Sequence, residues 1–485
     1  MAEGTYHATG TPAILLATVG PGVVNAINVV ANAWQDQVPM IFLTGCVDAA
    51  EAESYTHQVF DHTKVIAPIS KASMVAADGA VDVMIDKALA IATADPPGPV
   101  HIDVPIGLAG AVSKPSGYPR YTKPSLTVPA DGPDLARARD AIANAERPLM
   151  ICGVEVLHHD AADAVSEVAH RLSIPTLTSY KAKGVIAEDD LLSLGGHGLS
   201  PKSFKLLKPL IDDADVIVLA GYDPIEMRID WRHVWQPDTE GKTVIEISAQ
   251  PNRHFVHQAD ISFVCDVGAG LRALTEGLNG KPTWADGKAL KMRESLKAAF
   301  PTDEVWGPAA VIDAARQAFP KHGFAAVDTG AHRILLSQQW TSYGPRTLVQ
   351  STGLCTMGCA MPLAMGHKIA NPDTPVIAFT GDAGMEMILG EMATLRDMKL
   401  PVVTIVFVDE SLSLIELKQR ANSQDNVGVD FGGTDFAAVA QAMGGNGVTA
   451  TSREALMSAI EAGLNADTFT IIACPIGRKA YDGRF

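Results

Sequence analysis

Residues 376–409 read VIAFTGDAGMEMILGEMATLRDMKLPVVTIVFVD, and this stretch decides the fold. Val376–Thr380 and Val402–Val408 are continuous apolar runs, which are typical of strands buried on both faces of a parallel sheet. Between them, Met385–Lys399 carries apolar residues every three or four positions, so it predicts an amphipathic helix. Strand, helix and strand in this order form the crossover connection that parallel strands require.

The same alternation of apolar runs and amphipathic stretches recurs along the whole chain. Helix-like segments such as Ala161–Leu172 lie between the runs. The other runs are Ala13–Ala17, Met40–Leu43, Val100–Val104, Leu149–Cys152, Val216–Ala220 and Val244–Ile247. The pattern predicts an α/β protein with three doubly wound domains and mainly parallel sheets.

Two changes in composition place the domain boundaries. Residues 114–129 hold four prolines (Pro115, Pro119, Pro124 and Pro129) and cannot form a helix interior. A weaker change falls at Asn279–Trp284. We therefore expect domains at residues 1–125, 130–280 and 290–485. The first opens on a helix-like piece, Met1–Thr9, so we expect it to lack a first strand; a true start with a small helical cap is the alternative.

Charge and composition exclude several classes of protein. The 485 residues carry a formal net charge of −17, which disfavours nucleic acid and anionic membranes as partners. No apolar stretch approaches the length of a membrane span, and no signal peptide follows Met1. The six cysteines show no close CxxC pairing, so we expect reduced thiols and a cytoplasmic enzyme.

The turn Gly381-Asp382-Ala383-Gly384 is the strongest candidate site. A Gly-rich turn between a strand and a helix presents free N–H groups and a positive dipole end, which suit a phosphate. Asp382 ends one strand, and Asp409, 27 residues later, ends the next. Two carboxylates at one sheet edge suit Mg²⁺ together with a diphosphate. A plain Gly-Asp turn is the alternative for the motif taken alone.

With these motifs, the chain resembles the thiamine diphosphate-dependent enzymes, in particular large catalytic subunits of the acetolactate synthase type. Gly381-Asp382-Ala383-Gly384 with Asp409 resembles the family's GDG…N element, and the third metal contact, a main-chain carbonyl, falls at Ser411. Met357 is similar to the apolar residue that supports the bent cofactor. Asp328-Thr-Gly330-Ala-His332 matches the loop that touches the phosphates; for His332, a structural histidine is the alternative.

The resemblance extends to the N-terminal block. Thr18-Val-Gly-Pro21-Gly-Val-Val-Asn25 resembles the TSGPGATN loop on the pyrimidine side of the cofactor. Gln58 and Lys71 match positions near the substrate in the synthases, and a solvated surface lysine is the alternative for Lys71. The family order is a pyrimidine domain, a central domain and a diphosphate domain.

Two departures from the family pattern stand out. Asp409 replaces the metal-binding asparagine and adds negative charge beside a diphosphate. The glutamate that hydrogen-bonds the aminopyrimidine ring would lie upstream of Met1, and Glu3 matches a different position. We therefore expect the chain to be short at its N-terminus and assign the catalytic acid to no residue.

The resemblance implies Mg²⁺- and thiamine diphosphate-dependent decarboxylation of pyruvate or a similar 2-oxo acid, followed by carboligation. The alternatives are a 2-oxo acid decarboxylase, a hydroxyketone or acyl-CoA lyase, or a non-catalytic paralogue or truncated form. Family members place the cofactor between subunits, so a homodimer or homotetramer is expected. Some synthases bind FAD in the central domain, but no GxGxxG motif supports flavin here.

Overall fold

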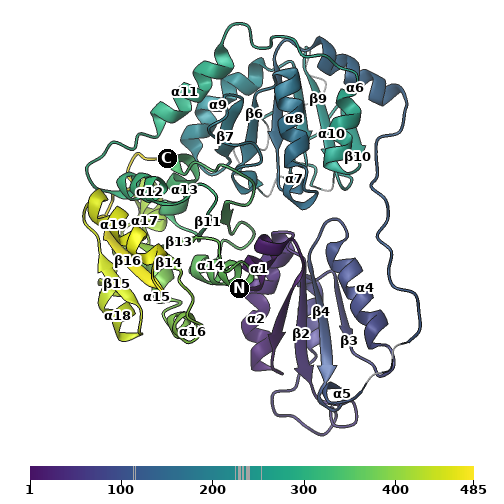
Figure 1. Ribbon diagram of the computed structural model, residues 1–485, viewed down its shortest axis with the longest axis vertical. Coiled ribbons are helices and arrows are strands. Elements are labelled where there is room, and N and C mark those ends of the chain that lie inside the picture. Colours follow the sequence, from purple (N-terminus) through teal and green to yellow (C-terminus); the bar gives the residue numbers. More distant parts are fainter. Residues whose placement is uncertain are drawn as a thin grey trace. The chain divides into compact units, whose positions relative to one another are not determined.

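The computed structural model describes residues 1–112, 114, 116–223, 226–227, 231, 234–235, 241–252 and 254–485. Their strands form three sheets, one after another along the chain, in which every pairing is parallel (Figure 1). This confirms the predicted α/β class with three parallel-sheet domains. The chain divides into two compact units, one made of residues 1–125, 351–356 and 369–372 and the other of the remaining residues.

The N-terminal sheet has the strand order β1-β2-β4-β3. Its strands are β1 (Ala13–Ala17), β2 (Met40–Cys46), β3 (Ala72–Val75) and β4 (Pro99–Pro105). Its helices are α1 (Ala2–Thr9), α2 (Pro21–Gln35), α3 (His62–Ile66), the 3₁₀ turn η1 (Ala67–Ile69), α4 (Val81–Thr93) and α5 (Ile106–Ala109). Phe42 packs against α2 on one face, and Ile41 packs against α4 on the other, so helices cover both faces.

The central sheet has the order β10-β9-β8-β5-β6-β7. Its strands are β5 (Pro148–Cys152), β6 (Thr176–Ser179), β7 (Ser193–His197), β8 (Val216–Ala220), β9 (Thr243–Ser248) and β10 (Ile261–Val264). Its helices are α6 (Pro133–Asn144), α7 (Glu155–His158), α8 (Ala162–Leu172), the 3₁₀ turn η2 (Tyr180–Ala182), α9 (Pro201–Asp213), α10 (Val267–Thr275) and α11 (Lys288–Ala299).

The C-terminal sheet has the order β12-β11-β13-β14-β16-β15. Its strands are β11 (Phe324–Val327), β12 (Leu348–Gln350), β13 (Val376–Gly381), β14 (Val403–Val408), β15 (Asn446–Thr449) and β16 (Thr470–Pro475). Its helices are α12 (Pro308–Ala318), α13 (Ala331–Gln339), α14 (Ala360–Ala370), α15 (Asp382–Glu386), α16 (Glu391–Asp397), α17 (Ser413–Ala421), α18 (Phe436–Ala442) and α19 (Arg453–Leu464).

The side chains of the continuous apolar runs pack into a hydrophobic core on each face of this C-terminal sheet. Successive residues of β11 alternate between two clusters, with Ala325 in one and Ala326 in the other. The first cluster takes apolar side chains from α12, α13 and α19, and the second takes them from α14, α16 and α18. A strand buried on both faces cannot alternate apolar and polar residues, which explains the runs seen in the sequence.

The predicted helix at Met385–Lys399 is wrong in its extent. The structure begins α15 at Asp382, directly after β13, and separates it from α16 by turns at residues 387–390. Here the Glu391 amide donates to the Ile388 carbonyl and the Met392 amide to that of Leu389, in place of α-helical bonds. Gly390, a weak helix former, lies at this break.

The proline-rich stretch after the first sheet has no regular secondary structure where the structure describes it. Residues 116–130 contain neither helix nor strand, in keeping with the proline-rich linker, and Pro115 lies outside the described residues. The domain limits at 125–130 and 280–290 stay predictions. Among the helices of the described part of the chain, none has the length and apolar character needed to cross a membrane.

Two buried glutamates fill the crevice of the central sheet. Its strand order reverses between β5 and β8, where doubly wound sheets bind dinucleotides. There a Glu226 Oε1 accepts the Val154 amide at 2.8 Å, and Glu155 accepts the Ala249 amide at 2.9 Å. The two glutamates therefore accept hydrogen bonds from main-chain amides that could otherwise bind a phosphate. This part of the central domain adds no support for FAD.

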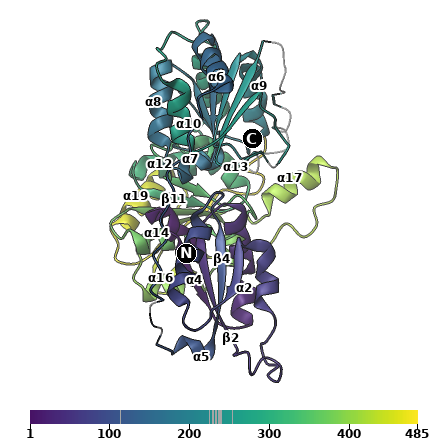
Figure 2. The same cartoon turned by 90° about the vertical axis from the view of Figure 1, so that its right-hand side faces the viewer.

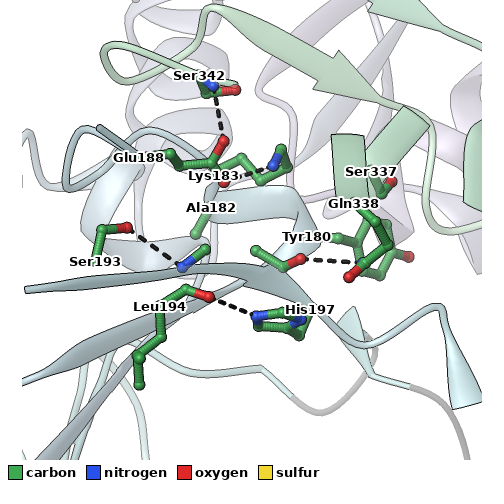
Figure 3. A network of polar contacts seen from close by, with 12 residues as sticks. Tyr180, Ala182, Lys183, Glu188, Ser193, Leu194, His197, Ser337, Gln338 and Ser342 are labelled. Atoms are coloured by element: carbon green, nitrogen blue, oxygen red, sulfur yellow. Dashed lines mark hydrogen bonds and ion pairs between the residues drawn. The ribbon is translucent and has the colours of Figure 1, made fainter. Parts of the chain in front are cut away.

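A buried ion pair of the central domain, Lys183 with Glu188, also contacts the C-terminal domain through Ser342 (Figure 3). Lys183 Nζ lies 2.5 Å from Glu188 Oε1, and both side chains are almost fully buried. The second Glu188 oxygen accepts the Ser342 amide at 2.7 Å. Gln338, near the end of α13, donates to the Gly196 carbonyl at 3.3 Å. These contacts fix α13 against the central domain.

The buried ion pair predicts a large loss of stability when one partner is removed. Glu188→Ala leaves the Lys183 ammonium buried without its counter-ion, which should cost about 3–5 kcal/mol. Differential scanning calorimetry measures the loss. The double variant Lys183→Met with Glu188→Gln removes both charges and should recover most of it. Equal losses in the two proteins would contradict a dominant role for the charge.

Glu155 predicts a specific pH dependence of stability. Burial raises its pKa to about 7, and the bonds from Ala249 and Ser248 oppose this rise. With this raised pKa, the folded protein holds the protonated carboxyl more readily than the unfolded chain does, which stabilises the fold. This stabilisation is complete below about pH 4.3, the ordinary pKa of the unfolded chain, and is lost as the pH rises to about 7. The melting temperature of Glu155→Gln minus that of wild type should therefore increase by several degrees from pH 5 to pH 8.

The exposed residue Glu294 on α11 offers the matched control for this measurement. Glu294→Gln should track wild type at both pH values, because this side chain is exposed to water in the folded protein as it is in the unfolded chain. A constant difference between Glu155→Gln and wild type across this range would show that Glu155 does not titrate in the folded protein as inferred.

Candidate functional site

The site lies at the carboxyl edge of the C-terminal sheet. Asp328, Asp382 and Asp409 directly follow β11, β13 and β14, and parallel strands bring these ends to the same edge. The strand order reverses between β11 and β13, the place where open α/β sheets bind ligands. A cavity of about 140 Å³ opens there. It is lined by Thr329, Gly330, Ala331, His332, Met357, Gly381, Asp382, Ala383, Gly384, Phe407, Asp409, Ser411, Leu412, Ser413, Leu414, Ile415 and Tyr481.

The carboxylates of Asp382 and Asp409 face the cavity and are 4% and 6% exposed as residues. One Asp382 oxygen accepts the amides of Asp409 and Glu410 at 3.0 and 2.7 Å, and the other accepts the Ala383 amide at 2.8 Å. Asp409 accepts the Ser413 hydroxyl at 2.5 Å. Hydrogen bonds from the main chain thus fix Asp382 beside Asp409.

Burial of the two carboxyl groups makes their ionised forms costly. It raises the pKa of Asp409 to about 6; the Ser413 bond opposes this, and the charge of Asp382 adds to it. Burial also raises the pKa of Asp382, against three amide bonds that lower it. Neither residue forms an ion pair with Lys or Arg among the described residues. A cation beside the pair would relieve both costs.

The donor set fits a hard divalent cation. Carboxylate oxygens are ligands that Mg²⁺ prefers, and it usually keeps waters and phosphate oxygens as well. In the described ranges, no three His, Cys, Asp or Glu side chains gather in a metal-binding group. A cation at Asp382 and Asp409 would therefore complete its shell from main-chain, water or cofactor oxygens.

His332 is fixed at the cavity wall by Asp328. Its Nε2 lies 2.8 Å from one Asp328 oxygen, and its ring stacks on Phe407. The other Asp328 oxygen accepts the Gly358 amide at 2.6 Å and the Thr380 hydroxyl at 2.7 Å. Asp328 thereby joins three segments of the cavity wall, and His332 is both hydrogen-bonded and part of that wall.

The glycines of the site permit close approach of the main chain. A Cβ at Gly384 would lie 2.5 Å from an Asp328 oxygen, so a larger residue would displace that carboxylate. Gly358 has φ 78° and would place a Cβ 2.8 Å from the Gly384 carbonyl. The structure brings Gly330, Met357, Gly381, Ala383 and Ser411 into the same cavity wall, as the sequence motifs predicted for one site.

The N-terminal compact unit brings a second group of predicted residues together. The Gly20 amide donates to His62 Nε2 at 3.2 Å, and the His62 Nδ1 lies 2.9 Å from a buried Asp103 oxygen. Gly20 has φ 63°, and a Cβ there would lie 2.6 Å from the Gln58 carbonyl. The loop from Thr18, which continues into α2 with Pro21 and Asn25, therefore lies against Gln58.

Lys71 does not join this group, and its predicted place near the substrate stays a prediction. It directly precedes β3, and its amide bonds to the carbonyl of Pro99 at the start of β4. This is the amino edge of the sheet, whereas the Gly20 loop follows the carboxyl end of β1. Its Nζ donates to the Ala94 carbonyl at 2.5 Å, and burial lowers its pKa.

Residues 351–356, which precede Met357, are held by α2. Asp36 accepts the amides of Thr352 and Gly353 at 3.1 and 2.7 Å. Asn32 accepts the Ser351 hydroxyl at 3.0 Å and also bonds to Glu3 of α1. Glu3 therefore has a structural partner in the N-terminal unit.

Several residues of the site escaped the sequence motifs. Asp328 opens the motif that runs to His332, but its bonds to the Gly358 amide and the Thr380 hydroxyl were not predicted. His62, Asp103, Thr380 and Tyr481 carry no such local signal, since their roles depend on partners far along the chain.

Comparison with known proteins agrees with this architecture. Three family models match in chain order: the thiamine pyrophosphate enzyme N-terminal TPP binding domain at residues 1–65, the central domain at 135–274 and the C-terminal TPP binding domain at 328–474. Together they cover more than half of the chain.

Curated relatives that align with most of this chain are named acetolactate synthases. Acetolactate synthase of Bacillus subtilis (strain 168) is 27% identical, covering 98% of this chain and 84% of the relative. The acetolactate synthase large subunit of Parasynechococcus marenigrum (strain WH8102) is 29% identical, covering 98% and 79%. Isozyme 1 large subunit of Escherichia coli (strain K12) is 29% identical, covering 86% and 74%. With three matching domain models in the family order, this chain belongs to the thiamine pyrophosphate enzyme family.

Proposed function

We propose that the protein is a thiamine diphosphate- and Mg²⁺-dependent enzyme that decarboxylates pyruvate or a similar 2-oxo acid and joins the product to a second carbonyl compound. The family membership and the acetolactate synthase relatives support the reaction class. The observation that carries the metal and cofactor assignment is the buried pair Asp382 and Asp409, which line the same cavity.

In this proposal, the carboxylates of Asp382 and Asp409 and the main-chain carbonyl of Ser411 hold Mg²⁺. The cavity wall formed by Gly330, His332 and the turn at Gly381, Asp382, Ala383 and Gly384 would hold the diphosphate. The short helix α15 begins at this turn, so first-turn amides that Asp382 does not already accept would be available to an anion. The metal neutralises charge that two carboxylates and a diphosphate would otherwise concentrate in one place.

The bound cofactor supplies an electron sink for loss of CO₂ from a 2-oxo acid. The chain contributes binding, orientation and exclusion of water. Met357 supports the cofactor from the apolar side of the cavity. Thr18, Pro21 and Asn25 form the pyrimidine-side loop, and the pair His62–Asp103 fixes that loop through the Gly20 amide. Gln58, beside the loop, is the substrate-side candidate.

We further propose a homodimer or homotetramer in the cytoplasm as the working form. The relatives include large subunits of acetolactate synthases, which supports an assembly of more than one chain. A purely monomeric, fully active protein would contradict this assembly.

Substitution of Asp409 tests the metal assignment. Asp409→Ala removes one proposed ligand and should weaken Mg²⁺-dependent binding of thiamine diphosphate by at least about 100-fold, measured by isothermal titration calorimetry. Asp409→Asn keeps an oxygen ligand and should retain binding. Asp425→Ala, which changes an exposed carboxylate, is the matched control. Binding by Asp409→Ala that equals wild type would refute this metal site.

Product analysis tests the reaction. With pyruvate, Mg²⁺ and thiamine diphosphate, we expect acetolactate, the carboligation product, detected by NMR of the reaction mixture. Release of acetaldehyde without a new C–C bond would instead identify a simple decarboxylase. Turnover of neither kind, in a protein that binds the cofactor, would contradict pyruvate as the substrate.

A further inference from the structure

Tyr481 is a buried residue of the cavity that no motif predicted. It follows β16 in the last ten residues of the chain and is 2% exposed. It lines the same cavity as Asp382 and Asp409. Its ring packs in the apolar cluster that contains Phe407 and Leu335, so packing fixes the side chain.

The hydroxyl of Tyr481 is buried and has no hydrogen-bond partner among the described residues. Burying a hydroxyl without a partner is unfavourable, and a phenylalanine would fill the same space without that cost. Buried tyrosine hydroxyls usually find a partner. The position therefore leaves an unused donor beside a cavity.

The surroundings keep this hydroxyl protonated. Burial raises the pKa of Tyr481 well above its ordinary value, and the negative charges of Asp409 and Asp382 raise it further. A neutral phenol in the wall of a cavity can donate a hydrogen bond to an anionic oxygen bound there.

Ion pairs fix the segment that carries Tyr481. Arg420 on α17, which projects from the side of the C-terminal domain in Figure 2, binds Asp482 at 2.6 Å and Glu416 at 3.0 Å. Arg484 forms a second ion pair with Glu304. Asp482 and Arg484, one and three residues after Tyr481, are thus paired with other elements, which limits the movement of this segment.

We infer that Tyr481 is a positioning residue for the cofactor, whose hydroxyl donates a hydrogen bond to an oxygen of the diphosphate group held at Asp382 and Asp409. The inference rests on the proposed function. It explains why a tyrosine with an unsatisfied hydroxyl stands where a phenylalanine would pack equally well.

Tyr481→Phe tests the inference through two readouts. The affinity for thiamine diphosphate with Mg²⁺, measured by calorimetry, should fall about tenfold, because a hydrogen bond to a charged group is lost. The affinity for inorganic diphosphate with Mg²⁺ should fall by a similar factor. Without cofactor, the melting temperature should stay equal or rise, since the substitution removes an unsatisfied buried hydroxyl.

Tyr343→Phe is the matched control, because Tyr343 lies in the same domain against Arg316 and Lys321 and does not line the cavity. Unchanged cofactor affinity in Tyr481→Phe would overturn the inference. A lower melting temperature of the cofactor-free variant would overturn it too, because it would show that the Tyr481 hydroxyl has a hydrogen-bond partner within the protein. If wild type itself binds no thiamine diphosphate, the proposed function fails as well, so the two failures are distinguishable.

Discussion

The burial of two facing carboxylates at one sheet edge is the constraint on which the site depends. Each of Asp382 and Asp409 would ionise more readily in water, and burial raises both pKa values. The main chain offsets part of this cost through the amides that Asp382 accepts from the loop after β14. A divalent cation bound between the two carboxylates would offset the rest of this cost, as proposed above.

The fold around this pair restricts movement from several directions. Asp328 holds His332, Thr380 and the Gly358 amide, and this arrangement requires a glycine at 384. The far end of α13, whose first turn carries His332, is fixed to the central domain through Gln338. Rigid support of this kind keeps oxygen ligands in place before a cation binds, so little ordering remains to be done on binding.

The sequence predicted the elements that local pattern controls. Apolar runs located β1, β8 and most of the other named strands within a residue or two, because strands buried on both faces leave a continuous signal. The 27-residue spacing placed Asp409 beside Asp382, since one crossover separates neighbouring parallel strands. The break at residues 387–390 was not predicted, because the apolar spacing continues through it.

The remaining site residues depend on contacts that sequence alone does not show. His62 meets Gly20 and Asp103 from more than forty residues away in each direction. Tyr481 reaches the cavity from the end of the chain. Lys71 matches a motif position near the substrate. The register of β3 and β4 places it at the amino edge of its sheet, opposite the edge that carries the Gly20 loop.

The most direct test of the carboxylate pair as a metal site is a crystal structure of the protein with thiamine diphosphate and Mn²⁺, with anomalous diffraction recorded. Mn²⁺ takes the oxygen ligands that Mg²⁺ prefers and can be located by its scattering. We predict one strong anomalous peak within coordination distance of both Asp382 and Asp409. Electron density for the cofactor in this cavity with no peak beside the two carboxylates would contradict the assignment.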